Sequence, residues 1–183
     1  MENNTGFIAQ NIAYYLDSDY SVITFGMSVM EDYMFNNFLL PDILRNVKSK
    51  KIITTTNPNN GILADMNFED SVFIIDLDEI TNYYSKGIPS VIERARYIHA
   101  YTMDLRKFCT NSRNSVIIKK SIFYTFGTES LSPNSIAYAS DVILMIDKGV
   151  IKSTKNRFGE RDIINNNLFA LMREQKINEI LED

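Results

Sequence analysis

Three charged side chains stand where predicted strands end. Asp76 closes the apolar run SVFIID, and Lys155 and Arg157 lie two apart in the stretch VIKSTKNRFG. Ligands of open α/β sheets bind beyond the carboxyl ends of the strands. A carboxylate there can orient the Mg²⁺ of a bound triphosphate, and an arginine fork suits phosphate oxygens. These residue types indicate nucleotide chemistry, although Asp76 could instead begin a polar loop and the two cations could be a solvated strand end.

The elements that must position these residues alternate between helical and extended patterns, which predicts an α/β domain with a mostly parallel sheet. Strands are predicted at 21–25, 51–56, 71–76, 115–118, 142–146 and 150–154. Helices are predicted at 7–16, 29–40, 89–111 and 167–181, the second ending before Pro41. Residues 78–89 and 123–133 are predicted to be loops. We expect one domain over residues 1–183, with a core at about 5–161 and a helical tail at 162–183.

The composition limits the classes to which the protein can belong. Its formal charge of -4 gives no overall sign of nucleic-acid binding, so any DNA contact would be local. The single Cys109 excludes an internal disulfide, and no apolar run reaches the length of a membrane span. The N-terminus lacks the basic-then-apolar order of a signal peptide. We therefore expect a cytoplasmic protein, in the host cytoplasm if it is viral, with no membrane contact and no metal at the lone His99.

Five segments carry a family resemblance when they are taken in chain order: TGFIAQNIAYYL, TFGMS, SVFIID, SVIIKKSIFYTFG and ASDVILMIDKGVIKSTKNRFG. Together they resemble the ATPase core of the RecA superfamily, closest to the branch of DnaB-type replicative helicases and RadA- or KaiC-like proteins. The resemblance covers roughly Thr5 to Arg161 and implies a RecA-like sheet flanked by helices. It places Asp76 at the Walker B position. It also matches Lys155 and Arg157 to the Lys-x-Arg-x-Gly ending, whose cations reach the neighbouring subunit's nucleotide as an arginine finger in hexameric relatives.

The groups that hydrolyse ATP in this family are missing. A phosphate loop reads G-x-x-x-x-G-K-[ST], and the alignment sets Asn4, Thr5 and Gly6 over its Gly-Lys-Thr. The chain begins at Met1, so the predicted sheet lacks the phosphate-loop strand. The catalytic Glu falls at Gly26, which has no side chain to act as a base. We therefore expect no catalytic residue and no cofactor, with ATP and Mg²⁺ bound only if a remodelled pocket survives.

Three functions remain open from the sequence. The first is a non-catalytic accessory protein of DNA replication, recombination or repair that docks on RecA-type or helicase subunits, or on its own copies, and supplies Lys155 and Arg157 to a neighbour's nucleotide. The second is the downstream fragment of a split DnaB-like ATP-dependent helicase. The third is a structural module or single-stranded DNA binder that uses residues 78–89 and 119–133, where aromatic rings beside cations could stack bases. Its candidate DNA contacts are Tyr83, Tyr84, Lys86, Lys119, Lys120 and Tyr124.

Overall fold

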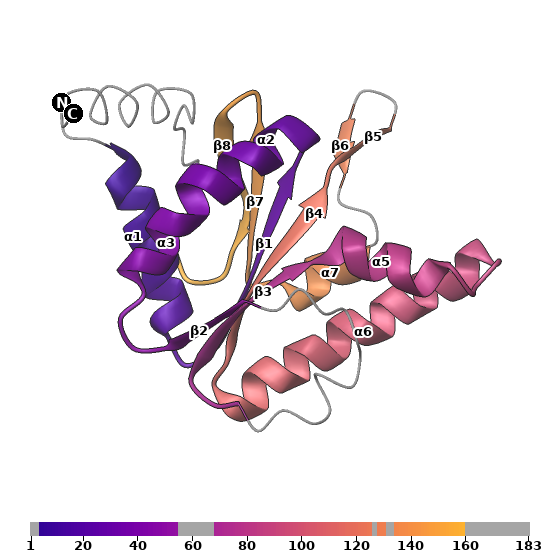
Figure 1. The fold of residues 1–183 in the computed structure, drawn as a ribbon, viewed down its shortest axis with the longest axis horizontal. Helices are drawn as coiled ribbons and strands as arrows, with labels where there is room; N and C mark the ends of the chain where they lie inside the picture. The colour runs from indigo at the N-terminus through magenta and orange to yellow at the C-terminus, as the bar shows by residue number, and fades with distance from the viewer. Residues whose placement is uncertain (1–3, 55–67, 126–127, 131–133, 160–183) are drawn as a thin grey trace.

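The chain folds around one six-stranded sheet with helices on both faces (Figure 1). We describe residues 4–54, 68–125, 128–130 and 134–159 of a computed structural model. The strands of this sheet are β1 (Ser21–Met27), β2 (Lys51–Thr54), β3 (Ser71–Asp76), β4 (Ser115–Ser121), β7 (Val142–Asp147) and β8 (Val150–Asn156). Their order is β2-β3-β4-β1-β7-β8, and only β8 runs antiparallel to its neighbour. The predicted fold class, α/β with a mostly parallel sheet, is confirmed.

Strand β1 lies inside the sheet and is hydrogen-bonded on both sides. It pairs in parallel with β4, where Ser21 faces Ser115, and with β7, where Ile23 faces Val142. All seven of its residues are buried, as expected for a parallel strand covered on both faces. The described part of the sheet is therefore continuous through its centre.

Two helical layers cover the sheet. On one face lie α1 (Asn4–Asp17), α2 (Val29–Met34), the π-helical segment η1 (Phe35–Leu39) and α3 (Leu40–Asn46). On the other lie α5 (Leu77–Ser85), α6 (Val91–Ser112) and α7 (Asn134–Ala139). Ile23 and Phe25 of β1 pack into the first layer, and Val22 packs into the second. The alternation along β1 follows the two-residue period of a strand.

The helix after β1 does not end before Pro41, so that prediction is wrong. It continues from α2 through η1 into α3 and ends at Asn46. Pro41 has no N–H group and would clash with the preceding turn of a regular helix. The wider π-helical turn, in which Leu40 N donates to Phe35 O, lies directly before Pro41 and fits this constraint.

Two predicted loops also contain regular structure. Residues 77–85 form α5, and residues 123–130 include the hairpin strands β5 (Phe123–Thr125) and β6 (Thr128–Ser130). Helix α5 begins because the Asp76 side chain caps its first turn, a role that the acidic run had concealed. The predicted tail at 162–183 lies outside the described residues. Among the residues described, no helix combines the length and apolar character needed to cross a membrane.

Candidate functional site

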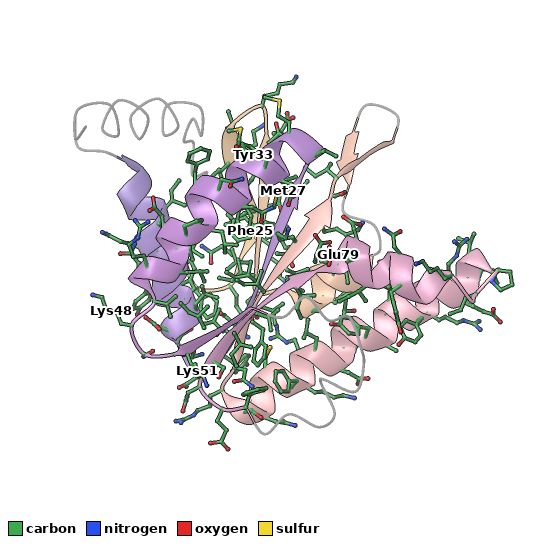
Figure 2. The ribbon with its side chains drawn as sticks, in the orientation of Figure 1. Phe25, Met27, Tyr33, Lys48, Lys51 and Glu79 are labelled. Carbon is green, nitrogen blue, oxygen red and sulfur yellow. The ribbon has the colours of Figure 1, made fainter. Side chains whose placement is uncertain are left out.

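A cavity of about 170 Å³ lies at the carboxyl ends of β1, β3 and β4. The chain leaves β1 for the far edge of the sheet at β2 and later returns past it to β7, so the order switches at β1. Ligands of open α/β sheets bind at such a switch point. Figure 2 labels Met27 of β1 and Glu79 of α5 at this cavity. Its lining consists of Met27, Val29, Asp32, Asp76, Asp78, Glu79, Asn82, Lys119, Lys120 and Ser121.

Lys119 joins two carboxylates across this cavity. Its Nζ lies 3.1 Å from Oδ1 of Asp32 on α2 and 3.2 Å from Oδ2 of Asp76 at the end of β3. Only 14% of the Lys119 side chain is exposed. Burial lowers the pKa of Lys119, but the two carboxylates more than offset this and raise it above its usual value. The ammonium group is therefore charged and fixed between two elements.

Asp76 has a second task that uses its other oxygen. Its Oδ1 accepts hydrogen bonds from the backbone N–H groups of Asp78, at 3.0 Å, and Glu79, at 3.1 Å. These bonds satisfy donors in the first turn of α5 that have no partner within the helix. The predicted Walker B-like carboxylate does lie at the cavity, and both of its oxygens are engaged within the chain.

Lys120 and Asp78 form a second ion pair beside the first. Lys120 Nζ contacts Asp78 Oδ1, and Ser121 N donates to Asp78 Oδ2 at 2.6 Å. The Lys120 side chain is 5% exposed. Burial raises the pKa of Asp78, but the hydrogen bonds from Lys120 and Ser121 hold it below its usual value. This pair ties α5 to the end of β4.

The connection from β1 to α2 is a single residue, Ser28. The helix begins at Val29, and Asp32 N donates to Ser28 O at 2.9 Å, so no loop separates strand from helix. Gly26, aligned with the catalytic Glu, lies within β1 opposite Lys120 and Met145. The residues aligned with Gly-Lys-Thr, which are Asn4, Thr5 and Gly6, begin α1 and do not line this cavity.

Arg157 lies at the opposite edge of the sheet, beside the amino ends of the parallel strands. Its Nη1 is 3.1 Å from Oδ1 of Asp141, whose side chain is 1% exposed. Asp141 also accepts from Val22 N at 2.9 Å and from Arg106 Nη1 at 2.7 Å. The Arg157 guanidinium stacks near the ring of Tyr20, 5.1 Å from its centroid. These contacts close the amino end of the sheet.

Lys155 lies at this same edge and binds backbone carbonyls. Its Nζ donates to Ala137 O at 2.7 Å and to Ser140 O at 2.5 Å, at the C-terminal end of α7. Cations are favourable there because the last carbonyls of a helix have no partner within it. Burial lowers the pKa of Lys155 despite the nearby Asp141 carboxylate. Both finger-like cations are thus remote from this chain's own cavity.

The predicted DNA contacts separate into two groups. Lys119 and Lys120 are buried in the ion pairs at the cavity, whereas Tyr83 on α5 is 49% exposed and Lys86 at its end is exposed. The side chains of Tyr84 and Tyr124 lie outside those that the structure describes. The structure therefore does not gather these residues into one surface.

Asp32, Asp78 and Asp141 were not singled out from the sequence. Asp32 falls at the Lys position of a G-x-x-x-x-G-K-[ST] spacing counted from Gly26, a signal that only a search for charge-inverted motifs would find. Within the described residues, no group of three or more His, Cys, Asp and Glu side chains is arranged to hold a metal ion. Cys109 is buried, which raises its pKa to about 12 and leaves it unreactive.

Comparisons with known proteins bear on the fold. No family model matches the sequence, and no curated protein sequence matches it. A KaiC-like protein, PH0186 from Pyrococcus horikoshii, has a similar structure, with a TM-score of 0.50 and 8% identity over 78% of this chain and 82% of that one. The ATPase domain of a DnaB-type helicase gives a TM-score of 0.49 and 9% identity over 79% of this chain and 80% of that one. The chain has the fold of a RecA-superfamily ATPase core, as the sequence resemblance predicted.

Proposed function

We propose that this RecA-like domain neither binds nor hydrolyses Mg·ATP and acts as an accessory protein through contacts with other subunits of a ring or filament in DNA replication, recombination or repair. The observation that carries the proposal is the placement of Lys119 between Asp32 and Asp76. A lysine of the same chain already neutralises the carboxylate that would otherwise orient Mg²⁺. The cavity is therefore neutralised from within, without a metal.

We infer that the β1–α2 junction, rather than Asn4 to Gly6, is the remnant of the phosphate loop. A phosphate loop joins a strand to a helix, and β1 with α2 is the strand–helix pair at the switch point. Counting from Gly26, the positions of Gly, Lys and Ser/Thr hold Glu31, Asp32 and Tyr33. The glycines and the cation that cradle phosphates are thus replaced by a helix turn that carries two acids.

The charges at the cavity oppose a triphosphate. Its lining holds four carboxylates and two lysines, which gives a formal charge of -2, and both lysines are already paired. Two like unit charges 4 Å apart repel by about 4 kcal/mol at an effective dielectric constant of about 20. A phosphate beside Asp32 would meet repulsion of this order and would have no free ammonium group to offset it. The residues present do not fit Mg·ATP.

The test is a titration of the protein with a fluorescent ATP analogue and Mg²⁺, repeated with Asp76→Ala and with Asp104→Ala as a matched control. Asp104 is an exposed acid on α6 that lies outside the cavity lining. We expect no saturable binding by any of the three proteins. Saturable binding that Asp76→Ala weakens and Asp104→Ala does not would overturn the proposal.

The role of Lys155 and Arg157 towards a neighbour's nucleotide stays a prediction. Arg157 keeps 41% of its side chain exposed, and its contact with Asp141 would have to be shared or broken for it to reach a phosphate. A mixing experiment tests this role once a nucleotide-binding partner is in hand. We expect Arg157→Ala to lower the partner's ATPase rate and Arg45→Ala, an exposed arginine on α3, to leave it unchanged.

A further inference from the structure

The first turn of α2 carries apolar side chains that nothing in the described chain covers. Val29 is 86% exposed, Met30 60% and Tyr33 62%. Residues three and four apart are neighbours on a helix surface, so Tyr33 adjoins both Val29 and Met30. Figure 2 shows Tyr33 on α2, beside the end of β1 that carries Met27. We call these three side chains the α2 patch.

The α2 patch borders the acidic cavity. Val29 and Asp32 of the same helix both line it, and the lining as a whole has two more carboxylates than lysines. Asp32, Asp76 and Asp78 keep 40%, 28% and 30% of their side chains exposed. A ligand seated on the patch would therefore place its neighbouring groups against partly exposed, net negative charge. Charge complementarity favours a cationic group at this position.

A third observation comes from Glu31 in the same turn. The residue is 5% exposed, and its Oε1 accepts a hydrogen bond from Lys148 N at 3.0 Å. Its Oε2 is buried and has no hydrogen-bond donor among the described residues. An unpaired buried carboxylate oxygen is costly, so this turn is suited to a partner that brings a donor, directly or through a trapped water.

We propose that the α2 patch and the cavity beside it form a docking surface for a partner protein segment that presents an arginine or lysine flanked by apolar side chains. The apolar residues of that segment cover the α2 patch, and its cation enters between Asp32, Asp78 and Glu79. A ring such as Tyr33 also favours a guanidinium over its face. A second copy of this chain fits less well because the chain carries a formal charge of -4. The proposal rests on the proposed function, since a bound nucleotide would compete for this cavity.

The probe is a pair of blocked synthetic peptides, one with a single arginine between leucines and one with neutral citrulline in its place. Each is titrated into ¹⁵N-labelled protein, and amide shifts give the affinity. We expect the arginine peptide to shift the amides of residues 28–33 and 77–79, and the citrulline peptide to bind at least tenfold more weakly. Raising the salt concentration should weaken the arginine peptide because the cation and the carboxylates are screened.

Matched variants locate the surface. We expect Val29→Ser with Tyr33→Ser to abolish arginine-peptide binding and Glu79→Gln to weaken it about threefold. Val91→Ser is the control because Val91 is 70% exposed on α6 and does not line the cavity. Equal binding of the two peptides, or equal loss with Val91→Ser, would refute the docking surface. So would self-association of the wild-type protein that the α2 variants abolish, because the occupant would then be a second copy.

A parallel titration with Mg·ATP separates this proposal from the previous one. If Mg·ATP shifts residues 28–33 and displaces the arginine peptide, the proposed absence of nucleotide binding fails although the docking surface stands. If neither ligand shifts these amides, the docking surface fails and the proposed absence of nucleotide binding stands.

Discussion

The buried ion pair between Lys120 and Asp78 gives a quantitative test of how the cavity is held. Replacing Lys120 by Met keeps the length of the side chain but leaves Asp78 with Ser121 N as its remaining partner at this position. Breaking a buried pair costs about 3–5 kcal/mol, and the 30% exposure of Asp78 moves the expected loss to about 2–3 kcal/mol. For a chain of 183 residues this lowers Tm by about 5–10 °C.

The assay is a double-mutant cycle with Lys120→Met, Asp78→Asn and both together, measured by urea unfolding and circular dichroism. Because the double variant leaves no unpaired charge, we expect a coupling energy of about 1–3 kcal/mol. The control is the pair Lys107–Asp104, which is 71% and 64% exposed and should contribute less than about 0.5 kcal/mol. A loss for Lys120→Met no larger than for Lys107→Met would refute the reasoning.

Three further predictions concern the carboxylates and Lys119. In the folded protein the pKa of the Asp78 carboxyl is lowered, so its contribution to stability is present above the unfolded value of 3.8 and is lost as the pH falls through the folded value. Unfolding at pH 5 to 2 should therefore show a smaller loss of stability for Asp78→Asn. Asp141→Ala should cost about 3 kcal/mol in urea unfolding, because it leaves Arg106 and Val22 N without their partner. Lys119→Glu places a third carboxylate beside Asp32 and Asp76 and should lower Tm by more than about 5 °C, without a selective effect on single-stranded DNA binding.

Each of these has a control and a contrary outcome. An unchanged acid profile for Asp78→Asn would show that this carboxyl does not carry the pH dependence. Asp70→Ala, which breaks a half-exposed pair with Arg113, should cost far less than Asp141→Ala, and equal costs would contradict the burial argument. Lys86→Glu changes an exposed lysine and should leave Tm unaltered. Loss of DNA affinity with unchanged Tm in Lys119→Glu would favour the DNA-binding function.

The fold was predictable from sequence because its strands are covered on both faces. Such strands appear as apolar runs, and β3 was predicted at Ser71–Asp76, as the structure has it. Helix α5 was missed because its start depends on a side chain, Asp76, that caps the backbone, and its acidic first turn has the composition of a loop. The passage of the helix through Pro41 depends on a π-helical turn, for which the sequence gives no periodic signal.

The site was predictable only in part. Asp76 could be placed at the crevice because it ends a buried strand. The partners of Lys119 and Lys120 could not, since these ion pairs join segments about 40 to 90 residues apart. The same holds for Asp141, which meets Arg106 and Arg157 only in the folded chain. Contacts of this range depend on the order of the strands, and spacing along the sequence does not encode them.

The most direct test of the self-neutralised cavity is an amide-shift titration of the ¹⁵N-labelled wild-type protein with Mg·ATP up to millimolar concentration. The ion pairs of Lys119 with Asp32 and Asp76 predict that the amides of residues 28–32 and 76–79 do not move in a saturable way. Saturable shifts confined to those residues would show that nucleotide displaces Lys119, and would contradict the account.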